Sequence, residues 1–267
     1  MGNSNDIPHD IPEEWVKGSL LDCGFNQLVN IPESIGSLSR LEVLWCSGNQ
    51  LMSLPDSIGS LSNLQGLWCR DNQLTSLPES ICHLSNLQEL DCVNNQLTKL
   101  PESIGSLSNL QNLYCFHNQL TKLPESIGYL SNLQVLNCSF NRLINLPESV
   151  GNLKKLEILI CNNNQLTNLP DSIGLLSNLQ ELFCNGNNIN TIYECYTDCY
   201  TDIDEFYTDI DKHYTHRSNI ANKFKCYLKI KRALNEQLII DLDTVSIIML
   251  FYNLVDHVPI TTTCVVC

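Results

Sequence analysis

The stretch LQELDCVNNQLTKLPESIGSLSN, residues 87–109, decides the fold because it recurs along the chain at a fixed period. The same pattern begins every 23 residues, without insertion or deletion, at Leu41, Leu64, Leu87, Leu110, Leu133 and Leu156. A divergent copy begins at Gly18 and a truncated copy at Leu179. Repeats of this length form units that bury their apolar faces only against their neighbours. The sequence therefore predicts a stack of eight coils.

Position 4 of the repeat anchors the predicted core. It is leucine in every copy, from Leu21 to Leu182, and with its neighbours it predicts a short strand. Side chains alternate along a strand, so positions 4 and 6 point into the coil while positions 3 and 5 point outward. Because the copies have equal length, we expect the strands to stack in parallel about 4.8 Å apart.

Position 6 is cysteine in every copy, and the chain holds 14 cysteines in total. The column consists of Cys23, Cys46, Cys69, Cys92, Cys115, Cys138, Cys161 and Cys184. A metal site needs ligands that converge tetrahedrally, and a column on parallel strands does not converge. A disulfide needs Cβ atoms about 3.8 Å apart, which is closer than parallel side chains on neighbouring strands come. We therefore expect reduced, buried thiols that pack as small apolar groups.

Two further features of the repeat belong to the scaffold. Position 9 is always asparagine, from Asn26 to Asn187, and stacked amides can satisfy the backbone groups exposed where each coil turns. The half-repeat LPESIG has proline and an acid where a helical turn begins and glycine where it ends. Each copy should form a short helical or 3-10 turn that places its acid on a solvated surface. In one copy Cys82 and His83 replace glycine and serine, which we interpret as surface variation.

The pattern LxxLxCxxNxLxxLPxSIGxLSN resembles the leucine-rich repeat family, and its LPESIGxL half is similar to the intracellular Ras-group and Scribble-like members. The resemblance implies an α/β solenoid with a curved parallel sheet on its concave side and short helical or 3-10 turns on its convex side. It also implies a protein–protein interaction scaffold or adaptor in intracellular signalling, with a small GTPase or a phosphatase as partner. The domains expected are a cap over 1–17, eight repeats over 18–192 and a small α-helical cap over 193–267.

The positions at which the repeats differ indicate where a partner binds, because the scaffold does not dictate them. Seven of the nine aromatic residues between Trp15 and Phe183 occupy the outward positions 5, 7 and 8. Aromatic residues are enriched at binding hot spots, so we expect a protein partner on the concave face. The alternative is that these side chains lean on neighbouring coils and only protect the sheet. The predicted partner-binding residues are Trp45, Trp68, Asp91, Tyr114, Phe116, His117, Phe140, Ile160 and Phe183.

Composition and motifs argue against several other functions. The net charge of −14 opposes binding to nucleic acid or anionic membranes, which need a basic surface. The repeats have no glycine-rich phosphate loop and His117 has no nucleophilic partner at a meaningful spacing, so we expect neither an enzyme nor a cofactor. The N-terminus lacks a secretory signal, and the longest apolar stretch, 246–255, is too short to span a bilayer. We therefore expect a cytoplasmic protein with free thiols.

The C-terminal region leaves alternatives open. Apolar residues recur there at helical spacing, with acids over 194–211 and bases over 212–232, which predicts two helices folded on each other. The basic helix could instead recruit a partner or a membrane. The alternative functions are a ubiquitin-ligase-type enzyme or substrate adaptor, active in this region, and a lipid-anchored scaffold.

Two further kinds of site, a metal site and a lipidation site, could lie near the chain ends. Cys195, Cys199, His213 and His216 come near the spacing of a two-Cys, two-His zinc site, but the gap between the pairs is one residue too long and the histidines are one too close. Lipidation would fall on Gly2 or Cys264, where the myristoylation and prenylation patterns are only partly met. We therefore predict no metal and no lipid.

Overall fold

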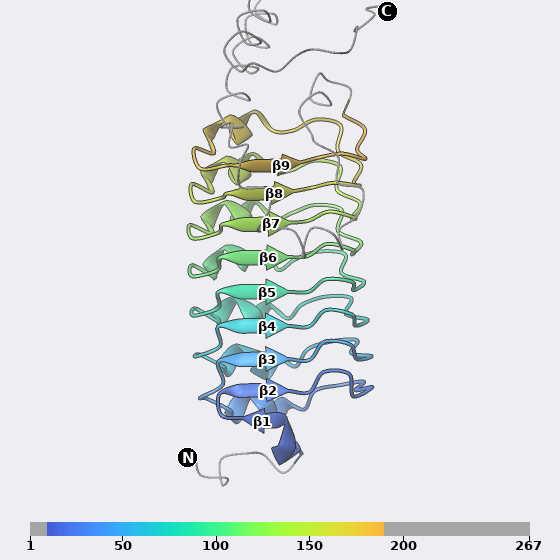
Figure 1. The fold of residues 1–267 in the computed structure, drawn as a ribbon, viewed down its shortest axis with the longest axis vertical. Helices are drawn as coiled ribbons and strands as arrows, with labels where there is room; N and C mark the ends of the chain where they lie inside the picture. The colour runs from blue at the N-terminus through green and yellow to red at the C-terminus, as the bar shows by residue number, and fades with distance from the viewer. Residues whose placement is uncertain (1–9, 190–267) are drawn as a thin grey trace, which may run out of the picture. The chain divides into compact units, whose positions relative to one another are not determined.

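The computed structural model describes residues 10–189, in which nine strands form one sheet in chain order (Figure 1). Strands β2 to β9 are parallel and each comes from one copy of the repeat, which confirms the predicted solenoid. Their register is uniform, because leucines of position 4 pair from Leu21↔Leu44 to Leu159↔Leu182. The predicted cap over 193–267, the four zinc-like residues and both lipidation positions lie outside the described residues.

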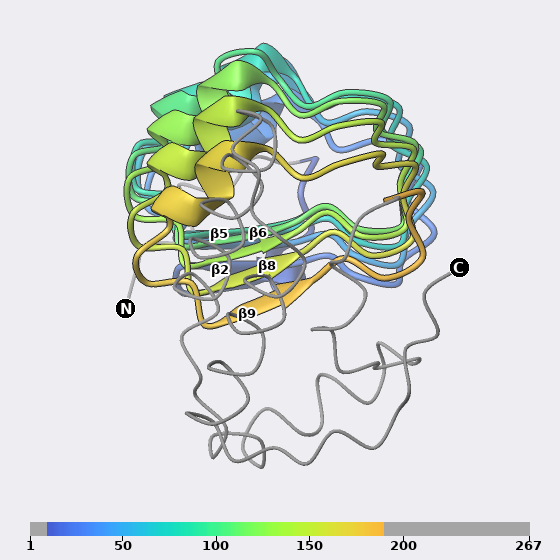
Figure 2. The same ribbon diagram turned by 90° about the horizontal axis from the view of Figure 1, so that it is seen from above.

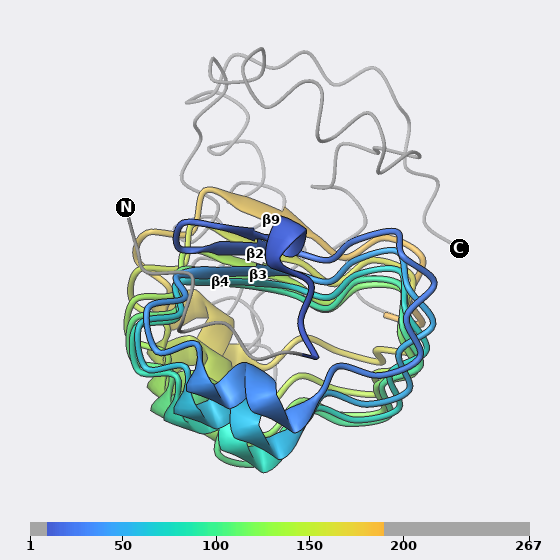
Figure 3. The same cartoon turned by 90° about the horizontal axis from the view of Figure 1, so that it is seen from below.

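Every repeat contributes one strand, and each of the first seven also contributes one 3-10 turn. The strands are β2 (Leu20–Asp22), β3 (Val43–Trp45), β4 (Gly66–Trp68), β5 (Glu89–Asp91), β6 (Asn112–Tyr114), β7 (Val135–Asn137), β8 (Ile158–Ile160) and β9 (Glu181–Phe183). The turns are η3 (Glu33–Ser37), η4 (Asp56–Ser60), η5 (Glu79–His83), η6 (Ile104–Ser106), η7 (Glu125–Tyr129), η8 (Glu148–Asn152) and η9 (Asp171–Leu175). Viewed along the stack, the strands and the turns lie on opposite sides of each coil (Figures 2 and 3).

The core fills the space between these two layers. Leucines of position 4 are buried from Leu21 to Leu159, and Leu182 is half-buried in the last described coil. The isoleucines and one valine of the turns, from Ile35 to Ile173, have no exposed surface. Burying one such side chain contributes roughly 1.5–3 kcal/mol, so the repeated apolar positions supply most of the stability of the stack.

The cysteine column is buried and all eight thiols are free, as predicted. The thiols also donate weak hydrogen bonds, which the sequence did not reveal. The Sγ atoms of Cys69 and Cys92 lie 3.3 Å from the carbonyl oxygens of Asp91 and Tyr114 in the following coil. Desolvation by burial raises the pKa of Cys138 to about 12, so these thiols stay protonated and unreactive.

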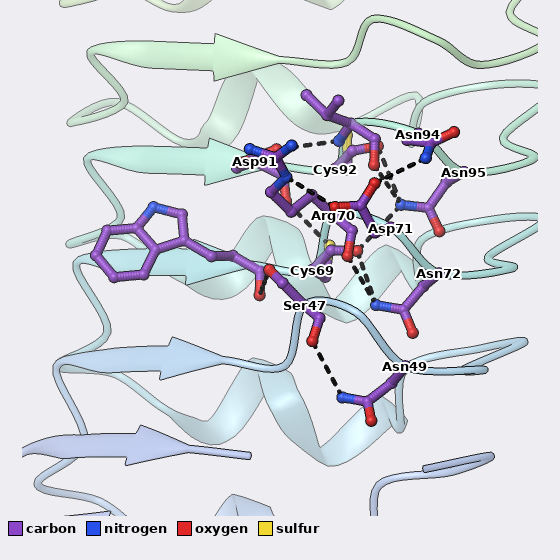
Figure 4. Close-up of polar contacts among 12 residues, drawn as sticks. Ser47, Asn49, Cys69, Arg70, Asp71, Asn72, Asp91, Cys92, Asn94 and Asn95 are labelled. Atoms are coloured by element: carbon purple, nitrogen blue, oxygen red, sulfur yellow. Dashed lines mark hydrogen bonds and ion pairs between the residues drawn. The ribbon is translucent and has the colours of Figure 1, made fainter. Parts of the chain in front are cut away.

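The asparagine column links each coil to the preceding one. In a representative copy, Oδ1 of Asn118 accepts the backbone N–H of Leu97 at 2.9 Å. Its Nδ2 donates to the carbonyl oxygens of Cys92 at 2.9 Å, Cys115 at 3.2 Å and Phe116 at 3.2 Å. Figure 4 shows this column at Asn49, Asn72 and Asn95. The predicted scaffold role of position 9 is therefore confirmed.

The N-terminal cap combines a 3-10 turn with a short antiparallel strand. A 3-10 turn, η2 (Glu13–Trp15), is followed by a strand, β1 (Val16–Lys17), that pairs antiparallel with β2. Gly18 allows the two-residue turn between these strands because its φ is +69°. β1 therefore covers the edge of β2, and an antiparallel hairpin begins the otherwise parallel sheet.

Cys82 is buried, so its interpretation as surface variation is wrong. Other copies have glycine at this position, and a Cβ at Gly59 would lie 2.5 Å from the carbonyl oxygen of Ser80 in the next coil. The side chain of Cys82 occupies the equivalent space against the following coil. The turn of that coil, η6, begins only at Ile104, two residues later in the repeat than the other turns. Crowding by one Cβ accounts for this shortened turn.

The acids of the turns support the next coil as well as their own. Glu33 Oε2 accepts the backbone N–H of Ser57 at 3.0 Å, and Glu148 Oε2 accepts that of Ser172 at 3.2 Å. These exposed acids therefore cap the 3-10 turn of the following copy, in addition to lying on a solvated surface as predicted.

Candidate interaction surface

The side chains of positions 3, 5 and 7 form the outer face of the sheet, which we call the strand face. Position 5 makes its central column, because these residues pair in register on neighbouring strands. In chain order the column contains Trp45, Trp68, Asp91, Tyr114, Asn137, Ile160 and Phe183. Six of the nine predicted binding residues therefore lie in one line across β3 to β9.

Aromatic residues of the strand face and of the adjacent position 8 lie in contact with one another. The rings of Trp45 and Trp68 meet edge to face with centroids 6.1 Å apart. His117 stacks on Phe140 with centroids 4.3 Å apart and planes inclined by 16°, and Phe116 lies 5.6 Å from His117. Such contacts stabilise the pairs by roughly 0.5–1.5 kcal/mol. These pairs therefore do lean on neighbouring coils, as in the alternative role. Such packing does not exclude a role in binding.

Exposure differs strongly among the predicted binding residues. Trp45 is 38% exposed, and Trp68, Asp91, Tyr114, Phe140 and Phe183 are partly exposed. Phe116 and Ile160, which we expected to be open to solvent, are each only 5% exposed. The sequence spacing gave the side of the strand on which a residue lies but not how much of that residue stays accessible. Among the aromatic residues of position 5, Trp45, Trp68, Tyr114 and Phe183 therefore keep accessible surface.

Asp91 lies in the middle of the strand face. Its Oδ1 accepts the backbone N–H of Val93 at 3.0 Å. The pKa of Asp91 is raised to about 6, chiefly by desolvation on burial; Glu89 and Asp71 add to the rise, while the Val93 N–H and Arg70 act in the opposite direction. Figure 4 shows Asp91 beside Arg70 and Asp71. The Nε of Arg70 donates to Asp71 Oδ2 at 3.0 Å.

Glu89 is a residue of this surface that the sequence analysis missed. The Nε1 of Trp68 donates to Glu89 Oε1 at 2.6 Å, which fixes the orientation of the indole. Glu89 occupies position 3, whose side chains lie beside those of position 5 of the preceding strand. Desolvation by burial raises the pKa of Tyr114 to about 12, with Glu89 and Asp91 adding to the effect. Only the register of the strands brings these four groups together.

Position 8, directly after the strand face, has a left-handed backbone in every coil. Its φ lies between 49° and 67° at Phe25, Gly48, Asp71, Asn94, His117, Phe140, Asn163 and Gly186. Glycine, asparagine, aspartate and histidine tolerate this conformation better than other residues, whereas phenylalanine rarely adopts it. The predicted binding residue Phe140 therefore occupies a strained position.

The potential metal ligands of the described coils do not cluster. Among residues 10–189, no three potential metal ligands of His, Cys, Asp or Glu type converge on one point. Within the same range, no helix has the length and apolar character needed to cross a membrane.

On another side of the coils, an open hollow is lined by Glu102, Lys122, Glu125 and Glu148 among others. Glu102 and Lys122 pair there at 3.3 Å, which is an exposed contact of little energetic weight.

Three family descriptions match the sequence. "Leucine-rich repeat region" covers residues 115–194, "Leucine Rich repeats (2 copies)" covers 62–106 and "Leucine Rich Repeat" covers 40–61. Among curated proteins, no significant sequence relative was found.

Several solved structures share the fold. A leucine-rich repeat protein of Leptospira interrogans is 38% identical, with a TM-score of 0.61, over 62% of this chain and 42% of that protein. The ectodomain of the plant receptor kinase GASSHO1/SCHENGEN3 from Arabidopsis thaliana, in complex with CASPARIAN STRIP INTEGRITY FACTOR 2, is 35% identical, with a TM-score of 0.55, over 59% of this chain and 20% of its own. The plant peptide hormone receptor RGFR1, in complex with RGF2, is 27% identical, with a TM-score of 0.55, over 59% and 30%. This chain thus spans less than half of each.

Proposed function

Because the chain belongs to the leucine-rich repeat family, we propose that it is a protein-recognition module that binds its partner on the strand face. Domains of this family typically mediate protein–protein interaction, and two of the similar structures are receptors in complex with their ligands. We further propose that the protein serves as a scaffold or adaptor in signalling inside the cell.

One observation carries this proposal: the variable positions of an otherwise uniform repeat hold accessible aromatic side chains on one face. Trp45, Trp68 and Tyr114 lie in the column of position 5, where other copies have aspartate or asparagine in the same register. Seven gaps of about 4.8 Å between β2 and β9 give a face roughly 34 Å long. A face of this length can accommodate the roughly 800 Å² that each partner buries in a standard interface.

The test compares substitutions on two sides of the coil. Affinity capture and mass spectrometry first identify the partner, and its dissociation constant is then measured by calorimetry. Trp68→Ala or Tyr114→Ala should weaken binding by about 2 kcal/mol or more, because hot-spot aromatics become fully buried only in a complex. Thermal unfolding must accompany the Trp68 variant, since the Trp45 and Glu89 contacts imply some loss of stability.

The matched control is Glu125→Ala in η7, on the side of the coil opposite the strands. Glu102→Ala serves the same purpose but also removes the ion pair with Lys122. Neither change should alter the dissociation constant. If partner capture depended on these acids and survived the loss of Trp68 and Tyr114, the strand face would not be the binding surface.

A further inference from the structure

Asp91 occupies an unusual place between two aromatic residues. It pairs in register with Trp68 on β4 and with Tyr114 on β6, so each aromatic residue lies one strand spacing away. The indole of Trp68 is held by Glu89, and the phenol of Tyr114 lies near both Glu89 and Asp91. A carboxylate thus lies between two aromatic residues at the centre of the strand face.

The repeats themselves show that the scaffold does not need this charge. Asn137 occupies the same position two coils later, where its Oδ1 accepts the backbone N–H of Ser139 at 3.1 Å. Asp91 makes the same bond to Val93 at 3.0 Å. An amide oxygen therefore performs the structural role of position 5 without the cost of partly burying a negative charge. The charge of Asp91 needs another explanation.

The cation beside Asp91 is shared with a second carboxylate. Where position 5 is an acid in the first coil, Asp22 pairs with Lys17 at 3.0 Å. Arg70 interacts with Asp91 and lowers its pKa, but the Nε of Arg70 donates to Asp71 Oδ2 at 3.0 Å. Positions 3, 5 and 7 of the eight copies hold the acids Asp22, Glu89, Asp91 and Glu181 against the base Arg70, and position 8 beside them adds Asp71. The strand face is complementary to a positively charged ligand.

We propose that Trp68, Asp91 and Tyr114 form a subsite for a basic side chain, preferably arginine, on an extended segment of the protein partner. This inference rests on the proposed function and specifies the chemistry of the partner. A guanidinium is planar, so it can stack on an aromatic ring while it donates two hydrogen bonds to a carboxylate. Cation–π contacts require a charge within about 6 Å of the ring centre, a distance compatible with strands about 4.8 Å apart. Glu89 acts as a positioning residue that holds the Trp68 indole.

The test uses the full chain and synthetic peptides. A library of random twelve-residue peptides displayed on phage is selected on the protein, and the strongest binders are resynthesised. Each is then made with its arginine replaced by citrulline, which keeps the shape of arginine but removes the charge. The dissociation constants of both peptides are measured with the natural protein, with Asp91→Asn, and with Glu125→Ala, in the turn η7, as a control away from the strand face. Circular dichroism confirms that each variant is folded.

The proposal predicts a basic residue at one common position of the selected peptides. Citrulline should weaken binding to the natural protein at least tenfold, and Asp91→Asn should weaken the arginine peptide by a similar factor. The citrulline peptide should bind the natural protein and Asp91→Asn equally, because the two changes remove the same contact. Glu125→Ala should leave the affinity within about twofold.

Other outcomes separate this inference from the proposed function. Peptides that need Trp68 and Tyr114 but carry no common basic residue would overturn the subsite and leave the binding face intact. If Asp91→Asn left the affinity for the arginine peptide unchanged, the subsite would likewise be overturned and the binding face left intact. Peptides that ignore Trp68→Ala and Tyr114→Ala would overturn both proposals. A doubled mass in light scattering that Trp68→Ala abolishes would assign the face to a second copy of the chain, and this too would overturn the subsite.

Discussion

Replacing Asn118 by alanine tests how neighbouring coils are held together. The amide is buried and bonds to the backbone of two consecutive coils: Leu97 and Cys92 in the preceding coil, and Cys115 and Phe116 in its own. Alanine keeps the backbone intact and removes only these contacts. The change therefore isolates the contribution of one rung of the asparagine column.

The expected magnitude follows from which groups lose their last partner. The carbonyl oxygen of Cys92 keeps a bond from Asn95 at 3.2 Å, and that of Cys115 keeps one from Asn141 at 3.0 Å. The N–H of Leu97 has no second acceptor among the described residues. A buried donor left unpaired costs about 1–3 kcal/mol, and the weakened carbonyl bonds add roughly 1 kcal/mol. Asn118→Ala should therefore lower the free energy of unfolding by about 2–4 kcal/mol.

Urea denaturation followed by circular dichroism measures this loss, and the chain provides a matched control. Asn26 occupies the same position in the first coil, but it is exposed and its Nδ2 donates only to the Gly24 carbonyl, at 2.8 Å. Asn26→Ala should cost less than about 1 kcal/mol, because water replaces the lost bond. If both variants lost the same amount, or if Asn118→Ala lost under about 1 kcal/mol, the column would not hold the coils together.

A second variant at Asn118 separates the contribution of its amide oxygen, which accepts a hydrogen bond, from that of its amide nitrogen, which donates. Asn118→Asp keeps an oxygen for Leu97 but turns a second oxygen toward the carbonyls of Cys92 and Cys115, which cannot donate to it. Its loss at neutral pH should equal or exceed that of alanine. Protonation restores one donor, so part of the stability should return in acid.

Three further predictions concern burial, charge and space. Thiol titration of the native protein should leave Cys115 and its column unmodified until denaturant is added, because burial raises their pKa well above the usual value. Asp91→Asn should stabilise the protein by about 1–3 kcal/mol at pH 8, and by little below pH 4, in thermal unfolding at both pH values. The sign follows from a folded pKa of about 6 against an ordinary 3.8, so ionisation weakens the folded state as pH rises through this window. Gly128→Ala should lower stability by about 1–3 kcal/mol in the urea assay, because its Cβ would lie 2.4 Å from the Ser149 carbonyl oxygen.

The period of the repeat was enough to predict the architecture. A leucine every 23 residues without gaps can be buried in all copies only if the strands align in register, which Leu21 to Leu182 do. The roles of cysteine and asparagine followed in the same way, because a residue fixed in every copy must serve the contact between copies. Wherever all copies agree, the physical constraint can be deduced from the sequence.

Features confined to one copy could not be predicted in this way. The hairpin of β1 depends on two residues before the first repeat, and the burial of Cys82 depends on how a Cβ meets the next coil. The contact between Glu89 and Trp68 depends on side-chain rotation, which spacing does not determine. Spacing likewise could not show that Phe116 and Ile160 would be buried. Their place on the strand face was correct, but their accessibility is a property of the folded surface.

Comparing the copies at position 8 shows which side chains the scaffold accepts and which aromatic residues need a functional explanation. Gly48, Asn94 and Asn163 demonstrate which side chains this left-handed backbone accepts at little cost. A bulky residue there costs roughly 1–2 kcal/mol, and the stack of His117 on Phe140 returns roughly 0.5–1.5 kcal/mol of it. Stability alone therefore gives little reason for aromatic residues in these two coils. The same argument applies to the charge of Asp91, which Asn137 shows to be dispensable for folding. The side chains that lower stability in the coils of β5 to β7 lie close together on one surface, as expected if a bound partner supplies the compensating contacts.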